Sequence, residues 1–241
     1  MRWMFETTVR DSVCQIRREG ARWLSTAWDG GYRTADAVYN VTVPEGFERT
    51  DLDAYRAERL SGAGFAVGPT LLTGVHMEHA RCARSGSVSV LATAGLSNPA
   101  ALPMSAAETA DGSDGTASNP ADSPDWRPGT VNLIVGVDRA LDEGALATLL
   151  ATAVEAKAAT LLDAASVPGT TSDAAIVGCV PSAERASFAG SATEIGAATR
   201  VCVRDAIRAS LAARYGGDAL PTVDGAEYGV VTDQDTEIFK P

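Results

Sequence analysis

The feature that most constrains the fold is a strand, a long helix and a second strand in direct succession. The run TVNLIVGV at 130–137 is strongly apolar and predicts a fully buried central strand. The alanine-rich segment from about Asp142 to Ala165 predicts a helix, and AAIVGCV at 174–180 predicts another buried strand. A further helix is expected over 193–217, where an apolar stripe ends at two glycines.

The first half of the chain has the pattern of strands joined by short turns. Strands are expected over 7–18 and 21–28 around the turn RREGA, and over 34–43, 65–82 and 87–95, with a short helix at 52–64. Hairpins followed by strand–helix–strand units favour the α+β class. We therefore expect a single domain over 1–217, with a mixed, largely antiparallel β-sheet packed by helices.

Two segments depart from this pattern. Residues 103–128 are rich in acidic and small residues and contain no Lys or Arg before Arg127. Because such a segment buries too little apolar surface to offset its ordering entropy, it is predicted to be a disordered acidic insertion. Residues 218–241 are polar and are expected to form a loose C-terminal tail.

The charge balance limits the classes of partner. The 241 residues include 31 Asp and Glu against 20 Lys and Arg, which gives a net charge of −11. This acidity is typical of proteins from a salt-rich cytoplasm and argues against nucleic acid as a partner, because phosphate binding needs clustered cations. With no apolar run near 18 residues and no secretory signal, neither a membrane span nor export is expected, and the predicted location is cytoplasmic.

Lysine is almost absent from the chain, and one of the two lysines occupies an unusual position. Lys240 is next to the end of the chain, whereas Lys157 lies in the predicted helix over 142–165. At about 100° per residue, Lys157 falls on the apolar face and Glu155 on the opposite side. Lys157 is therefore either a side chain that covers apolar surface or a cation at a pocket, where it would bind an anion or polarise a carbonyl.

Two loops carry further candidate polar groups. PGTTSDA at 168–174 is either a hydrogen-bonded turn or a site loop, in which Asp173 orients or activates a water and Thr170 or Thr171 contacts substrate. In ATAGLSNPA, Ser97 and Asn98 either cap a turn or face a ligand. In HMEH, His76 is preferred as a polar contact, because the expected strand would place the two histidines on opposite faces and disfavour shared metal ligation.

Gly-Thr pairs at 129–130 and 169–170 leave open self-cleavage that frees a threonine nucleophile. No GxSxG, Walker A or GxGxxG motif is present. Serine hydrolase, P-loop and Rossmann hypotheses therefore have no support in this chain.

Several segments in order resemble one known family. STAWDGGYRTADAVYNVTV, ATAGLSNPA, GTVNLIVGVD, EGALATLLATAVEAKAATLLD, PGTTSDAAIVGC and FAGSATEIG are similar to segments of the adenosylcobinamide amidohydrolase family, over about 10–215 without the insertion. The resemblance implies a halophilic archaeon-like source and cleavage of the amide that joins aminopropanol to the corrin ring of adenosylcobinamide. Adenosylcobyric acid would then enter cobalamin salvage. One departure is Thr171-Ser172, where the family is expected to have a second glycine.

The resemblance also implies a set of polar site residues, namely Asn40, Ser97, Asn98, Thr130, Asn132, Glu155, Lys157, Thr170, Asp173 and Thr193. For amide hydrolysis we expect Asp173 or Glu155 as the base and Lys157 or Asn132 as support for the oxyanion. No protein-bound cofactor or metal is expected, because the cobalt belongs to the corrinoid substrate. A non-catalytic corrinoid-binding protein and a self-processing threonine-nucleophile enzyme remain as alternatives, and the oligomeric state is left open.

Overall fold

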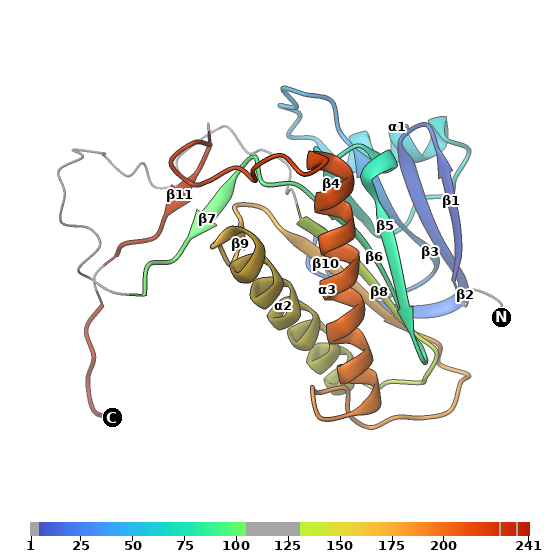
Figure 1. Ribbon diagram of the computed structural model, residues 1–241. Helices are drawn as coiled ribbons and strands as arrows, with labels where there is room; N and C mark the ends of the chain where they lie inside the picture. Colours follow the sequence, from blue (N-terminus) through green and yellow to red (C-terminus); the bar gives the residue numbers. More distant parts are fainter. Residues whose placement is uncertain (1–4, 105–130, 227, 235) are drawn as a thin grey trace.

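The computed structural model describes residues 5–104, 131–226, 228–234 and 236–241. Its main sheet has eight strands in the order β4-β3-β2-β10-β8-β6-β5, with β1 paired to β2 (Figure 1). The strands are β1 Glu6–Arg10, β2 Val13–Ser25, β3 Gly31–Thr42, β4 Thr70–Thr73, β5 Arg81–Ser85, β6 Val88–Ala94, β8 Val131–Val137 and β10 Ala174–Cys179. The helices are α1 Leu52–Gly62, the 3-10 helix η1 Met77–His79, α2 Glu143–Ala165 and α3 Glu194–Tyr215. The predicted mixed, largely antiparallel α+β architecture is confirmed.

The centre of the sheet is the strand–helix–strand unit. Strands β8 and β10 are buried along nearly their whole length and pair in parallel, with Ala174 opposite Asn132. Helix α2 connects them and begins at Asp142, whose side chain accepts a hydrogen bond from the Ala145 backbone N–H at 2.8 Å. Since β8 and β10 run in the same direction, α2 carries the chain back to the end of the sheet where both strands begin.

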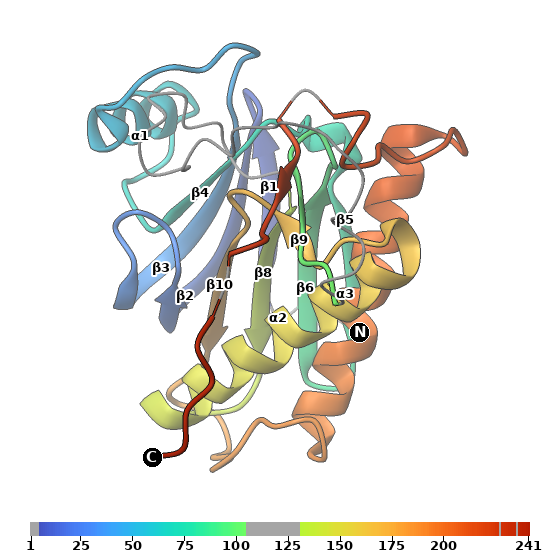
Figure 2. The same ribbon diagram turned by 90° about the vertical axis from the view of Figure 1, so that its left-hand side faces the viewer.

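Helices α2 and α3 lie side by side on one face of the sheet (Figures 1 and 2). Alternate residues of β8, among them Leu133 and Val135, form a core with these helices. Ile134 faces the other side, with Phe5 and Trp23. The apolar stripe expected over 193–217 packs into this core, where four of its residues are buried, namely Ile195, Cys202, Ile207 and Leu211.

The sheet curls strongly over its face opposite the helices. In the strand order, β2 and β10 separate β3 from β8. Nevertheless, Asn132 Nδ2 of β8 donates to Asn40 Oδ1 of β3 at 2.9 Å and to the Leu72 carbonyl of β4 at 2.8 Å. These hydrogen bonds span the inside of the curve, so the far edge strand β4 is brought over the start of β8.

The first predicted hairpin turn is in the wrong place. The chain reverses at Asp11 and Ser12, both with positive φ, and β2 then continues past the expected turn. The register of β2 against β3 shifts between Arg17 and Ala21. Gly20, with a φ of 63°, therefore marks a bulge inside a strand rather than the turn between two strands.

The continuous strand predicted over 65–82 is also wrong. Only β4 and the start of β5 are extended there, and η1 lies between them. His76 directly precedes η1, so the strand argument used to separate His76 from His79 does not apply; their rings lie 6.5 Å apart, edge to face.

A second, three-stranded sheet forms beside the main one, with β7 (Pro99–Ala101) between β11 (Val230–Val231) and β9 (Gly169–Thr170). Strand β11 pairs in parallel with β7, so the expected loose tail contributes one short strand. The expected insertion at 103–128 lies outside the described residues apart from its first two positions.

Helix α2 is, by length and composition alone, apolar enough to cross a membrane, and no other helix within the described ranges meets that test. Half of the apolar stretch of α2 is buried inside the protein, against the sheet and α3. The composition of α2 therefore matches its place as a core helix.

Candidate functional site

The polar centre of the site is the loop between β9 and β10. Asp173 Oδ2 receives hydrogen bonds from Lys157 Nζ and from the Thr170 backbone N–H at 3.1 Å. Asp173 Oδ1 receives one from the Thr170 hydroxyl. Because α2 ends beside the start of β10, the lysine of the helix and the carboxylate of the loop meet there. The structure thus brings together three of the predicted site residues.

Gly169 makes room for this cluster. A Cβ at position 169 would lie 2.6 Å from Asp173 Oδ2 and 2.9 Å from Lys157 Nζ. Both distances are too short for real contacts, so a side chain at this position would displace the ion pair. The glycine is required by the close approach of these two charged groups.

The inward direction predicted for Lys157 is confirmed. The side chains of Lys157 and Asp173 are each 12% exposed. Glu155 is 59% exposed and pairs across the protein surface with Arg200 of α3 at 3.4 Å. The structure therefore leaves Asp173, and not Glu155, as the carboxylate next to Lys157.

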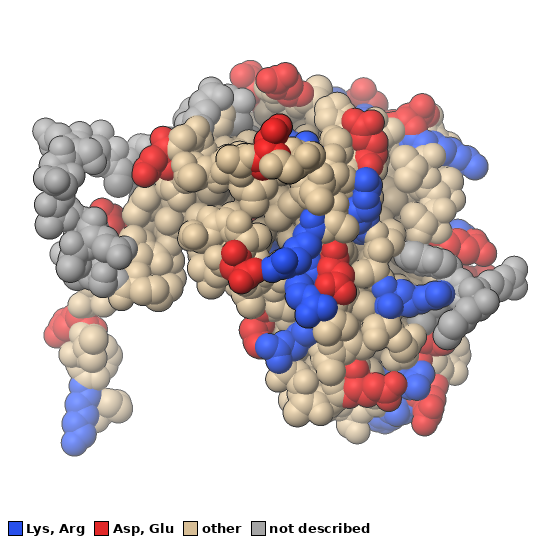
Figure 3. Space-filling model, viewed as in Figure 1, with Lys and Arg blue, Asp and Glu red and all other residues tan. Residues whose placement is uncertain are grey.

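The apolar face predicted for α2 differs in detail from the buried one. Val154 is exposed and Thr152 is buried, because α2 packs against both the sheet and α3. Lys157 lies at the border of this wider buried surface. Ion pairs such as Arg208–Asp163 link the outer sides of the two helices, where arginines gather along α3 (Figure 3).

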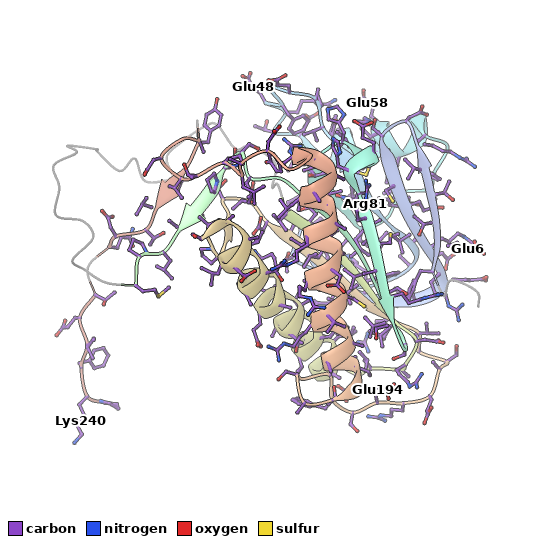
Figure 4. All side chains as sticks on the ribbon, viewed as in Figure 1. Glu6, Glu48, Glu58, Arg81, Glu194 and Lys240 are labelled. Carbon is purple, nitrogen blue, oxygen red and sulfur yellow. The ribbon has the colours of Figure 1, made fainter. Side chains whose placement is uncertain are left out.

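Asp173 faces a pocket of about 440 Å³ that we call the Asp173 pocket. Its walls come from the end of β2, from β4, from the loop before α1 and from the Asp173 loop. The lining residues are Thr26, Ala27, Trp28, Glu48, Arg49, Thr50, Leu52, Leu71, Leu72, Thr171, Ser172, Asp173 and Ala174. Glu48 marks the position of this edge in Figure 4. A carboxylate beside leucines and a tryptophan suits an apolar ligand with a polar reacting group.

Sequence reasoning missed the rim of the Asp173 pocket. The Trp28 indole N–H donates to Asp53 Oδ1 at 3.2 Å, and the Arg56 guanidinium lies 5.7 Å from the Trp28 ring. Arg49 lies nearby, and its hydrogen bonds hold the pKa of Asp51 below the usual range of a carboxyl. The signal that could have found Trp28 is its place in the WDGG turn, next to Thr26 at the end of a buried strand.

The buried asparagines have a different surrounding from the one expected. Asn40, Asn132 and Thr93 are completely buried inside the curled sheet. Asn40 donates to the Thr93 hydroxyl at 2.9 Å, and Asn132 uses both of its N–H donors on Asn40 and Leu72. Asn132 therefore has no amide hydrogen left for an oxyanion, and its Oδ1 has no hydrogen-bond partner among the described residues.

Three other predicted residues line a second pocket of about 550 Å³, the Arg214 pocket. Ser97 and His76 are exposed there, whereas Asn98 is 4% exposed. The Asn98 carbonyl accepts a hydrogen bond from the Thr171 N–H at 3.0 Å, and Thr171 lines the Asp173 pocket. The two pockets are thus neighbours joined through one backbone contact.

Thr193 lies away from both pockets. Thr193 accepts from the Gly196 N–H at 3.0 Å and caps α3 at its first turn, the end marked by Glu194 in Figure 4. The N-terminus of α3 lies at the opposite end of the sheet from the pockets. Thr130 lies outside the described residues. No group of three or more potential metal ligands occurs among the residues that the structure describes.

The arrangement has the parts that attack on a carbonyl needs. A carboxylate accepts up to four hydrogen bonds, and three of those positions on Asp173 are filled. Within the described part of the chain no group is found on the remaining acceptor position of Oδ1, and Asp173 lines the pocket. A fixed carboxylate with an adjacent ammonium can take a proton from water and stabilise a developing negative charge.

Comparison with known proteins identifies relatives over nearly the whole chain. The model of the adenosylcobinamide amidohydrolase family matches residues 4–219. An adenosylcobinamide amidohydrolase of Halobacterium salinarum is 51% identical over 241 residues, covering 99% of this chain and 100% of that protein. An adenosylcobinamide amidohydrolase of Methanosarcina mazei is 28% identical over 202 residues, covering 79% of this chain and 90% of that protein.

Proposed function

The chain belongs to the adenosylcobinamide amidohydrolase family, and on that premise we propose how the Asp173 pocket performs the reaction. The protein hydrolyses the amide that joins aminopropanol to the corrin ring of adenosylcobinamide. The products are adenosylcobyric acid, for cobalamin salvage, and the free amine. The observation that supports this assignment of the site is the Lys157–Asp173 pair over Gly169, in which Asp173 lines a largely apolar pocket.

Asp173 acts as the general base. A water bound at the free position of Oδ1 gives its proton to the carboxylate and attacks the carbonyl carbon of the amide. The tetrahedral intermediate then collapses, the C–N bond breaks, and the proton passes to the leaving nitrogen. Thr170 is a positioning residue, because its N–H and hydroxyl fix both oxygens of Asp173.

Lys157 supplies the positive charge of the site. One of its three N–H groups donates to Asp173, and no acceptor for the other two is found among the described residues. In the proposed mechanism these two donors stabilise the oxyanion or the leaving group. Lys157, rather than Asn132, fills the oxyanion role, because both amide hydrogens of Asn132 are already used.

The substrate chemistry fits a site without a metal or cofactor held by the protein. Water, a carboxylate and an ammonium suffice to balance the hydrolysis, and the cobalt enters as part of the corrinoid. The proposal also includes a cytoplasmic location and no nucleic-acid or membrane partner. The acidic, lysine-poor composition supports the cytoplasmic location and the absence of a nucleic-acid partner.

The experiment that tests this function is incubation of the purified protein with adenosylcobinamide, with adenosylcobyric acid measured by chromatography. Tight binding without product would contradict hydrolysis and favour a corrinoid-binding protein. An intact mass of 24.9 kDa would exclude self-cleavage at Gly169–Thr170.

Substitution of Asp173 by Asn is expected to lower kcat by at least about 100-fold, because the variant retains the shape of the side chain but loses the base. Asp163→Asn is the matched control, since Asp163 is an exposed carboxylate on α2 that pairs with Arg208. Glu155→Gln decides between the two carboxylates that the sequence left open. Full activity of Asp173→Asn, or loss of activity in Glu155→Gln, would place the base elsewhere.

A further inference from the structure

The Arg214 pocket contains a cation that is not held by a salt bridge within the described part of the chain, although Glu45 also lines the pocket. Arg214, near the end of α3, is half-buried and forms no salt bridge with any described residue. Its guanidinium lies 5.6 Å from the Tyr215 ring and packs over Gly95. A Cβ at position 95 would lie 3.1 Å from Arg214 Nε, so the glycine lets the guanidinium lie against the backbone at the end of β6.

A second group in this pocket is also prepared for a ligand. Asn98 is 4% exposed and lines the pocket, yet no side-chain hydrogen bond of Asn98 is found within the described part of the chain. A ligand in the pocket can therefore both donate to and accept from this amide.

The remaining walls of the pocket suit a flat heterocycle with a sugar. Phe47 and Tyr228 contribute aromatic surface, Ser97 adds an exposed hydroxyl, and Gly74 leaves backbone close to the space. A volume of about 550 Å³ lies within the range of about 300–1,000 Å³ typical of small-molecule sites. Glu45 lies at the same wall, which disfavours a phosphate or another anion as the occupant.

We propose that the Arg214 pocket binds the adenosyl group of the substrate, with the adenine edge on the Asn98 amide and its face on the Arg214 guanidinium. The asparagine amide matches the adjacent donor and acceptor of adenine, and guanidinium planes stack on bases. The inference rests on the proposed function, because it requires a substrate that carries an adenosyl group.

The position of the pocket supports this division of the substrate. Asn98 lines the Arg214 pocket and Thr171 lines the Asp173 pocket, and one backbone hydrogen bond joins them. A corrin ring that spans this contact has its aminopropanol amide at Asp173 and its adenosyl group at Arg214. The enzyme therefore selects adenosylated corrinoids by a pocket that takes no part in the chemistry.

The test compares kcat/KM for adenosylcobinamide with kcat/KM for methylcobinamide, in the wild type and in Asn98→Ala, Arg214→Gln and Arg84→Ala. The wild type is expected to prefer the adenosylated substrate. Asn98→Ala and Arg214→Gln should each lower that preference about tenfold through KM, with methylcobinamide turnover unchanged. Arg84→Ala is the control, because Arg84 is an exposed arginine on β5 that does not line the Arg214 pocket.

Direct binding separates this inference from the proposed function. Adenosine should bind the wild-type protein in calorimetry, and about tenfold more weakly to Asn98→Ala. Equal hydrolysis of both corrinoids by the wild type would overturn the adenosyl subsite and leave the amidohydrolase assignment standing. If neither corrinoid is hydrolysed, the proposed function fails, and adenosine binding alone decides the pocket. Arg214-dependent binding of inorganic phosphate in place of adenosine would overturn the proposal in favour of an anion site.

Discussion

Gly169→Ala tests whether the geometry of the Lys157–Asp173 pair matters for catalysis, because it adds one methyl group and removes no charge. The new Cβ would lie 2.6 Å from Asp173 Oδ2, whereas ordinary contact begins near 3.4 Å. The carboxylate must therefore move by about 0.8 Å. Misplacement of a reacting group by about 1 Å can lower a rate by about 100-fold. We expect kcat to fall by about that factor, with KM nearly unchanged.

The same substitution is expected to change stability little. The atoms that must move are the ends of two flexible side chains, and Gly169 is not among the glycines with positive φ. Replacing glycine where the backbone is unstrained stabilises a protein by about 0.4–1 kcal/mol, which offsets part of the displaced contact. The free energy of unfolding, measured by urea denaturation, should therefore stay within about 1 kcal/mol of the wild type.

The matched control is Gly144→Ala in the first turn of α2. A Cβ there would meet only Asp142 Oδ1, at 3.6 Å, so activity should be unchanged. The assay for both variants is steady-state hydrolysis of adenosylcobinamide. A folded Gly169→Ala protein with wild-type kcat would refute the reasoning, because it would show that the reaction tolerates displacement of the pair.

Two further predictions concern the interior. Asn132→Ala removes the amide that donates to Asn40 and Leu72 inside the curled sheet. The free energy of unfolding, measured by urea denaturation, should fall by about 2–4 kcal/mol. A change below about 1 kcal/mol would contradict the stabilising role given to these two hydrogen bonds. Burial raises the pKa of Cys14 to about 12 and that of Cys82 and Cys202 to about 11, so access of the reagent, and not ionisation, separates the exposed Cys82 from the buried thiols. Iodoacetamide should modify the exposed Cys82 alone in the native protein, and all four cysteines in urea, as read by mass spectrometry; native labelling of Cys14 would contradict the packing.

The parts of the fold that were predicted correctly are those with strong local signals. The buried strands over 130–137 and 174–180 have continuous apolar runs, and the helix between them has the capping residue Asp142. The hairpin turn was misplaced because Gly20 permits a bulge as readily as a turn, and only the pairing of β2 with β3 distinguishes the two. A local sequence pattern does not show which strands pair over long distances in the chain.

The same limit applies to the site. Helical periodicity was enough to point Lys157 inward and Glu155 outward. It could not show that Asn132 is engaged by β3 and β4, which come together only when the sheet curls. Nor could it separate Asn98 from Asp173, whose loops are in contact but open onto different pockets.

Both long helices point the same end at the functional edge of the molecule. Helices α2 and α3 start at Glu143 and Glu194 at one end of the molecule, and both finish at the other end, where β7 and β9 lie (Figure 1). A helix presents partial positive charge at its N-terminus and partial negative charge at its C-terminus. The helix dipoles therefore do not stabilise a negative charge on a ligand at this edge. Cationic side chains must provide that stabilisation. A chain with two lysines places Lys157 in the C-terminal half of α2 and Arg214 in the last turn of α3, where the arginine also interacts favourably with the dipole of its own helix.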